Sequence, residues 1–528
     1  MNLNRVDGGI LNRLWEEKYS RQQSAAVYLG EDRREDPLLF PGGISLFQHL
    51  QNGDKRRLIE TFLRFVKDRL DPPGELHLSA LREWLSTAVI ENLQQHQVYN
   101  GPGSSTIVLD ERRDPTDTTS ATRHWDSETY LRYPPIGLDV NTEKLDLPRL
   151  ASRLSRKRLE HGVERRTLHV CDVTSSCAMI IIATAPTRLI PILRTFFYNY
   201  LRFRPLIRIS MATIYNLEFH IPYLALRQAP KKIDSRGLRK AYKLPLPRPK
   251  DKEAYFYEAQ TSFVLTGVDE RLYTAICLAD TFFGSEEQRG SYTDPTSPLD
   301  APSGGGHWLN NPIWNPRQYL LKVLAKRISQ TRGEWMDLID QFVARLDHYE
   351  SGFELPDDPK LTKTTALTSA EITIRLFRDR LASTIRAWED FYSHKGGLFE
   401  VESIKLYSWW QTDVTAITES ISDLKEKHEL MAEKLEQFRS MRDGLVNASS
   451  FRESAEATRQ GNMIGILTRM TVLFLPLGWV TAFFGIPLLP HTLYLWIAYC
   501  GVLVVAILGT LYFARRPKLL ESLFESGM

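Results

Sequence analysis

Two long uncharged runs near the C-terminal end constrain this chain more than any other feature. Residues 470–489 and 493–513 contain no Asp, Glu, Lys or Arg. Each run is long enough to cross ~30 Å of hydrocarbon as an α-helix. Only Pro490, His491 and Thr492 separate them. The sequence therefore predicts two transmembrane helices, 470–489 and 493–513, joined as a tight hairpin.

The charges that flank the two runs predict their orientation. Arg459 and Arg469 precede the first run, and a basic tail over residues 514–528 follows the second. Positive residues are enriched on the cytoplasmic side of membrane segments, so both termini are expected in the cytoplasm. The first residues show no apolar signal sequence. We therefore expect the whole region ahead of the hairpin to be cytoplasmic as well. We interpret the chain as a two-pass integral membrane protein in a lipid bilayer. A simple hairpin anchor for a soluble protein is the alternative.

A long helical pattern leads into the first run, over residues 399–469. Apolar residues recur along it at alternating spacings of four and three, which defines a heptad seam. Its members are Ile417, Ile421, Leu424, His428, Met431, Leu435, Phe438, Arg442 and Leu445. Such a seam is typical of a stalk helix that packs against other helices above a membrane pore. A helix packed within its own subunit gives the same pattern. A single His on the seam is expected to be a packing residue, and no metal-ligand set is assigned.

The first membrane run carries a stripe of small and hydroxyl-bearing residues. At about 100° per residue, Ile464, Thr468, Thr471, Leu475, Gly478, Ala482 and Gly485 lie within roughly 100° of one another. Stripes of this kind suit a pore lining or a close helix contact. The predicted pore-lining residues are Ile464, Leu467, Thr468, Thr471, Leu475, Gly478 and Ala482.

The rest of the chain predicts an α+β cytoplasmic domain ahead of the stalk. Residues 1–100 are expected to form a helical extension, and residues 101–283 an α/β domain with β-rich runs, including one at Met179–Ile182. Residues 284–316, rich in Ser, Pro and Gly, predict a disordered loop. Residues 317–398 predict further helices. The 67 basic and 64 acidic residues give a net charge of +3, too small to indicate a nucleic-acid partner.

Catalytic signatures are absent from the sequence. It contains no P-loop, no Gly-x-Ser-x-Gly, no His-Glu-x-x-His and no dinucleotide fingerprint, so no catalytic residue and no cofactor is predicted. The four cysteines are Cys171, Cys177, Cys277 and Cys500. Without a His cluster beside them they do not predict a zinc site, and reduced structural thiols are expected.

The first membrane run also carries a motif. Leu467-Thr468, Phe474, Pro476-Leu477 and Gly485 match a Leu-Thr, Phe-x-Pro-Leu and Gly pattern in order and spacing. This text resembles the CorA family of magnesium channels, over residues 415–518. Two upstream segments, Leu217–Tyr223 and Ser262–Gly267, show a weaker resemblance to the large N-terminal regions of fungal CorA-like proteins. The resemblance implies a homo-oligomer, a pentamer, whose first membrane helix lines the pore and whose cargo is a divalent cation such as Mg²⁺.

Two positions of one motif depart from the family pattern. Where the family has Gly-Met-Asn at the outer mouth, this chain has Gly485, Ile486 and Pro487. In the family the Asn amide oxygen meets the hydrated cation, because Mg²⁺ sheds its water reluctantly. Pro487 offers no amide side chain, and the following loop contains no Asp or Glu. The sequence thus supports two functions, a divalent-cation channel with an altered selectivity motif and a non-conducting, membrane-tethered sensor or scaffold.

Overall fold

The protein is described by a computed structural model in which the chain divides into two compact units. Residues 1–353 and 368–438 form the N-terminal unit, and residues 354–367 and 439–528 form the C-terminal unit. The structure describes residues 45–46, 54–65, 75–92, 97–98, 105–112, 141–156, 163–211, 214–228, 230–249, 252–268, 270, 272–284, 289–294, 297–355, 360–399, 404–484 and 493–515.

An eight-stranded mixed sheet forms the centre of the N-terminal unit. Its strand order is β4-β3-β5-β10-β9-β7-β6, and β8 pairs with β9 beside this path. Only the β5–β10 pair is parallel; the other pairs in this sheet are antiparallel. The predicted α+β domain is therefore confirmed. The strands are β3 (Thr106–Arg112), β4 (Asn141–Leu145), β5 (Arg165–Cys171), β6 (Leu206–Met211), β7 (Tyr215–Gln228), β8 (Ala241–Lys243), β9 (Ala254–Gly267) and β10 (Tyr273–Ala279).

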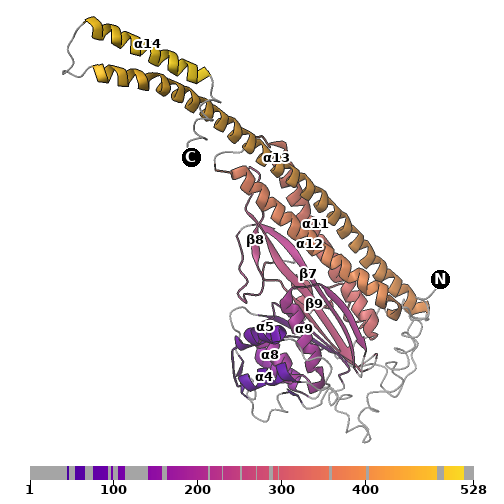
Figure 1. Ribbon diagram of the computed structural model, residues 1–528. Helices are drawn as coiled ribbons and strands as arrows, with labels where there is room; N and C mark the ends of the chain where they lie inside the picture. Colours follow the sequence, from indigo (N-terminus) through magenta and orange to yellow (C-terminus); the bar gives the residue numbers. More distant parts are fainter. Residues whose placement is uncertain are drawn as a thin grey trace, which may run out of the picture. The chain divides into compact units, whose positions relative to one another are not determined.

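Helices cover both faces of this sheet (Figure 1). One face packs on five helices through a single apolar core that includes Leu109, Val170 and Leu278 from the strands. On the other face, helix α11 contacts β7 and β9, and Tyr319 of α11 packs edge-on against Phe263. The five helices are α4 (Lys55–Arg64), α5 (Glu75–Ser86), α7 (Leu147–Ser155), α8 (Ser175–Thr184) and α9 (Ile190–Arg202), with the 3₁₀ turn η4 (Thr187–Leu189) ahead of α9.

The first hundred residues do not form a separate extension where the structure describes them. Leu58 and Phe62 of α4 and Leu81 of α5 are fully buried in the same core as the central strands. Burial of these apolar faces against α8 and α9 joins the two helices to the α+β domain. A short hairpin of β1 (Ile90–Asn92) and β2 (Gln97–Val98) follows α5.

The β-rich run at Met179–Ile182 is helical, contrary to the prediction. It lies in α8, whose N-terminus is capped by the Thr174 side chain accepting a hydrogen bond from the Cys177 amide. The helix is buried along nearly its whole length. A helix that is buried on all sides has no polar face, so its periodicity cannot be distinguished from that of a buried strand.

Residues 297–316 are packed into the domain, so the prediction of a disordered loop is wrong there. Asp300 and Ser303 are fully buried. Asp300 Oδ1 accepts a hydrogen bond of 2.9 Å from the Tyr319 hydroxyl and pairs with Arg165 at 3.4 Å. These polar contacts, together with the buried Leu309 and Ile313, hold the segment in place. Helix α10 (Arg289–Thr293) precedes it.

Three long helices follow: α11 (Pro316–Ser351), α12 (Thr362–Lys395) and α13 (Ile404–Phe484), with the 3₁₀ turn η5 (Gly396–Phe399) after α12. Within the N-terminal unit, the predicted seam of α13 is buried by its own subunit. Ile417, Leu424 and Phe438 are fully buried, and the Phe438 ring lies 6.3 Å from the Tyr349 ring of α11. The alternative of a helix packed within its subunit therefore holds for this part of the seam.

Ion pairs fix the register of α13 on α11. Lys427 Nζ lies 2.7 Å from Asp340, and Lys434 Nζ lies 2.6 Å from Asp347. Both pairs join residues 87 apart, so the two helices run parallel and repeat the contact after seven residues. On its other side α13 pairs with α12, through Lys425 and Glu389 at 2.5 Å.

The C-terminal unit contains the last part of α13 and helix α14 (Leu493–Arg515). Figure 1 shows α14 beside the final turns of α13. Among the described residues, no helix combines the length and the apolar character that a membrane crossing requires.

Candidate pore-lining surface

All seven predicted pore-lining residues lie on the last turns of α13, in the C-terminal unit. Each is exposed in the single chain. The large apolar members are among the most exposed, with 63% of Ile464, 68% of Leu467 and 69% of Leu475 open to solvent. Thr468, Thr471, Gly478 and Ala482 are exposed beside them. The structure thus brings the predicted residues together on one helix and leaves them uncovered within one subunit.

Val480 is the one buried residue among the described residues of the last turns of α13. It is 2% exposed, whereas its described neighbours Trp479 and Thr481 are exposed. At about 100° per residue, the seven predicted positions lie roughly 140–240° around the helix from Val480. The stripe therefore lies opposite Val480, and residues on the Val480 side such as Asn462 and Ile466 are exposed as well. An uncovered face of this kind is available to other copies of the chain or to a water-filled channel.

The hydroxyl groups of the stripe donate to the helix backbone. Thr468 Oγ1 donates to the Ile464 carbonyl at 2.8 Å, and Thr471 Oγ1 donates to the Leu467 carbonyl at 2.9 Å. A hydroxyl has one proton and two acceptor lone pairs. Because each proton is used by the backbone, the free capacity of both oxygens is to accept. Acceptors match the outward-pointing hydrogens of a cation's hydration shell.

Large apolar side chains are exposed around the whole C-terminal unit. On α14, Leu493 is 77%, Trp496 61% and Val505 70% exposed. Monomeric soluble proteins rarely leave contiguous apolar surface of this extent uncovered, and such surface marks contact with a partner or a membrane. Both helices that the sequence predicts to cross the membrane expose large apolar side chains in the residues that the structure describes.

The predicted selectivity-motif residues Gly485, Ile486 and Pro487 lie outside the described residues. The same holds for Pro490, His491 and Thr492, which follow them. Pro476 lies inside α13, between Leu475 and Gly478. Its nitrogen carries no hydrogen, so the Val472 carbonyl lacks the amide donor that a helix normally provides four residues later.

One acidic residue on the same line of α13 was missed by the sequence analysis. Glu453 is exposed and lies roughly 180° around the helix from Val480, at about 100° per residue. Its neighbour Glu456 lies about 60° to one side and pairs with Arg452 at 3.2 Å. Extending the stripe towards the N-terminus by helical periodicity would have found Glu453. The predicted stripe begins at Ile464, eleven residues after Glu453.

Metal-ligand clusters are not found among the described residues, in which no group of three or more His, Cys, Asp or Glu could hold an ion. His428 of the seam is half-buried. Cys171, Cys177 and Cys277 are buried thiols that form no disulfide, and Cys500 on α14 is an exposed one. Burial raises the pKa of Cys177 to about 12, so it stays a neutral thiol at physiological pH.

A buried cluster of Ser262, His220 and Glu218 on the sheet has the hydrogen-bond distances of a hydrolase triad. His220 Nδ1 lies 2.7 Å from Ser262 Oγ, and His220 Nε2 lies 2.8 Å from Glu218. Burial opposes ionisation of Glu218, but the hydrogen bond and charge of His220, together with Arg208, lower its pKa to about 2. All three members are fully buried, so no substrate reaches the hydroxyl. The cluster joins β7 to β9 instead.

Comparison with known proteins gives no family assignment. No protein-family model matches the chain, and no curated protein matches it. Similar solved structures include full-length CmaX (13% identity, 67% of this chain and 88% of that chain, TM-score 0.30). Another is the CorA magnesium transporter from Methanocaldococcus jannaschii, with 12% identity over 78% of this chain and 97% of that chain and a TM-score of 0.30. A third is the ZntB cytoplasmic domain from Vibrio parahaemolyticus, with 10% identity over 57% of this chain and 93% of that chain and a TM-score of 0.21. TM-scores this low do not establish a shared fold.

Proposed function

We propose that the chain is one subunit of an oligomeric membrane pore that conducts divalent cations, with the stripe of α13 as the pore lining. The observation that carries the proposal is the uncovered face opposite Val480. It gathers hydroxyl, small and apolar side chains on a helix whose residues 470–484 contain no charge. Several copies arranged around an axis would turn this face toward the axis and enclose a channel.

The membrane hairpin is part of this proposal. Residues 470–489 and 493–513 are free of charge, and the described residues of both expose large apolar side chains. Acyl chains would cover these side chains on the outer side of the assembly, and the basic residues after 514 would hold the tail in the cytoplasm. The N-terminal unit would then be cytoplasmic.

The cargo class follows from the sequence resemblance to CorA-like channels of the fungal type. The pentameric state is taken from the same resemblance. No resident cofactor is needed, because the cation is the cargo. In the pore, Thr468 and Thr471 would accept hydrogen bonds from the ion's water shell, while rings of Ile464 and Leu475 would gate by excluding water.

Flux measurements on the purified full-length chain test the proposal. In liposomes loaded with a magnesium-sensitive dye, an inward Mg²⁺ gradient should produce dye signal above that of protein-free liposomes. Thr471→Val removes one acceptor from the stripe and should lower this flux about two- to tenfold, a loss of up to ~1.4 kcal/mol of ion stabilisation.

Thr481→Val is the matched control for this experiment. Thr481 also donates to a backbone carbonyl, that of Gly478 at 3.0 Å, but it lies roughly 80° away from Thr471 around the helix. It should leave the flux unchanged. Equal losses in the two variants would argue for a structural role of the hydroxyls and against the assigned face.

A non-conducting sensor or scaffold is the second candidate function. The observation that favours it is Gly485-Ile486-Pro487, which provides no side-chain oxygen at the outer end of the stripe. If no divalent cation crosses liposomes that contain an oligomeric, folded chain, the scaffold is the better account and conduction is rejected.

A further inference from the structure

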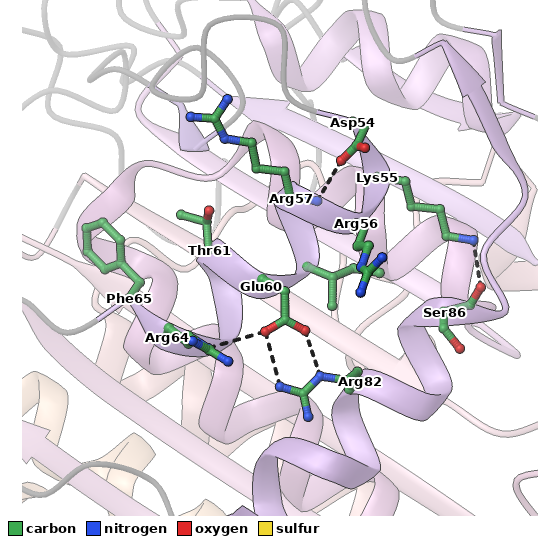
Figure 2. A pocket seen from close by; sticks show the side chains of 11 residues that line it. Asp54, Lys55, Arg56, Arg57, Glu60, Thr61, Arg64, Phe65, Arg82 and Ser86 are labelled. Atoms are coloured by element: carbon green, nitrogen blue, oxygen red, sulfur yellow. Dashed lines mark hydrogen bonds and ion pairs between the residues drawn. The ribbon is translucent and has the colours of Figure 1, made fainter.

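An open groove of about 1370 Å³ lies along helix α4 in the N-terminal unit, far in the sequence from the stripe of α13. Figure 2 shows its side chains around the exposed side of α4 and the facing turns of α5. The lining residues are Asp54, Lys55, Arg56, Arg57, Ile59, Glu60, Thr61, Arg64, Phe65, Arg82 and Ser86. They include five cationic side chains and two carboxylates, a surplus of three positive charges.

The two carboxylates of the groove are already engaged. Glu60 accepts hydrogen bonds from Arg82 Nε at 2.7 Å and Arg82 Nη2 at 3.2 Å, and Arg64 Nε lies 3.3 Å away. Asp54 accepts from the Arg57 backbone amide at 2.7 Å as the N-cap of α4. The bond from Arg82 is the main reason that the pKa of Glu60 is lowered.

One of the cations is engaged as well. Lys55 Nζ donates to the Ser86 carbonyl at 2.6 Å and to the Ala88 carbonyl, which ties α4 to the end of α5. Arg56 and Arg57 are exposed, and neither guanidinium forms an ion pair within the part of the chain that the structure describes, although the charge of Arg56 contributes to the lowered pKa of Glu60. The surplus charge of the groove therefore lies mainly on these two neighbouring arginines.

The floor of the groove is held firmly in the fold. Leu58, Phe62 and Leu63 of α4 are fully buried. Arg194 of α9 donates to the Leu63 and Phe65 carbonyls, both at 3.0 Å, and so satisfies the C-terminal end of α4. The arginines thus project from a fixed helix, which lowers the entropy cost of binding a ligand.

We propose that this groove binds a small polyphosphate, with Arg56 and Arg57 as its main contacts. Guanidinium groups match phosphate oxygens in charge and in bidentate geometry. The groove is larger than a single phosphate requires, so it fits a chain or cluster of phosphates, either free or on a lipid headgroup. The proposal does not depend on ion conduction.

Binding to the purified full-length chain tests this site, with inorganic triphosphate, ATP and inositol hexakisphosphate as soluble probes in calorimetric titrations. Mixed phosphatidylcholine and phosphoinositide vesicles, against phosphatidylcholine alone, test the headgroup source. We expect at least one probe to bind, with an affinity that falls as salt rises. The double variant Arg56→Gln/Arg57→Gln should bind at least about tenfold more weakly.

The control is Arg378→Gln/Arg386→Gln, which removes two arginines from helix α12, outside the groove. It should bind as the unchanged chain does, and both variants should keep the thermal midpoint. Equal binding of all soluble probes would mean that phosphates alone are recognised, and binding only to phosphoinositide vesicles would assign the headgroup. Absence of binding to every probe, or equal losses in the two double variants, would overturn the proposal.

Discussion

At the scale of single residues, the outer end of the proposed pore departs most from the CorA-like pattern. Ile486 and Pro487 stand where that pattern has Met and Asn. Restoring an amide oxygen should strengthen hydrogen bonding to the hydrated cation. The double substitution Ile486→Met/Pro487→Asn should therefore raise Mg²⁺ flux about tenfold or more in the liposome assay. Unchanged flux in a folded, conducting oligomer would show that this end does not limit conduction.

Glu453 gives a second prediction at this scale. In an oligomer, its carboxylate would form a negative ring on the same line as Thr471 and Leu475, and such a ring concentrates cations locally. Glu453→Gln should lower divalent-cation flux about three- to tenfold at low ionic strength, with a smaller effect at high salt. Glu456→Gln, at the position paired with Arg452, should change the flux much less. Equal effects would contradict the ring.

At the scale of elements, the buried seam of α13 makes the helix a part of its own subunit's core. Leu435 is 2% exposed between the long helices. Leu435→Ala should lower the free energy of unfolding by about 2–5 kcal/mol, because it removes buried methyl groups and leaves a cavity. Val446→Ala, at a position that is 49% exposed, should change it by less than about 0.5 kcal/mol. Denaturant unfolding of the full-length chain measures both.

The elements also show where sequence patterns succeed. The β-rich runs in residues 101–283 predicted an α+β domain, and the eight-stranded sheet confirms that fold class. Helix α8 was mistaken for a strand, because burial on all sides removes the periodic signal. The segment at Asp300 was taken for disorder, because buried ion pairs such as Arg165–Asp300 leave no local pattern. Arg165 and Asp300 lie 135 residues apart in the sequence, so a local sequence pattern does not predict their contact.

The candidate site was predictable in part. Residues of the stripe share a face by helical spacing, and this needs no tertiary information. Which side of the helix is covered, however, depends on packing around Val480, and the sequence does not specify that contact. For the same reason, the sequence did not decide whether the heptad seam packs against other helices above a pore or within its own subunit. The contacts of α11 and α12 decide this.

At the scale of the whole molecule, the uncovered stripe predicts assembly. One subunit leaves Ile464, Leu467 and Leu475 more than 60% exposed, and a pore around this face needs several copies of the helix. We expect the detergent-solubilised protein to have several times the 60.8 kDa mass of one chain, and five times if the pentamer is correct. Light scattering with detergent correction measures this mass, and a monomer would contradict the assembly.

Topology is the second prediction at this scale. A thiol introduced by Ser526→Cys in the tail should be protected from impermeant reagents in intact cells, and should react after permeabilisation. Cys500 is the exposed native thiol among the described residues, so it should first be replaced by Ala. A thiol introduced by His491→Cys, between the two uncharged runs, should react from outside. Labelling of residue 526 in intact cells would refute the proposed orientation.

Pro476 links the helix backbone to hydration. Hydrocarbon provides no hydrogen-bond donor for the Val472 carbonyl, and an unsatisfied carbonyl there costs on the order of several kcal/mol. The nearby Thr468 and Thr471 hydroxyls already donate to other carbonyls. If residues 470–489 cross the membrane, Val472 lies near the cytoplasmic end of the crossing, where water can reach its carbonyl and donate to it. A helix of this sequence would be penalised if lipid surrounded this turn, and the penalty disappears where the turn stays wet.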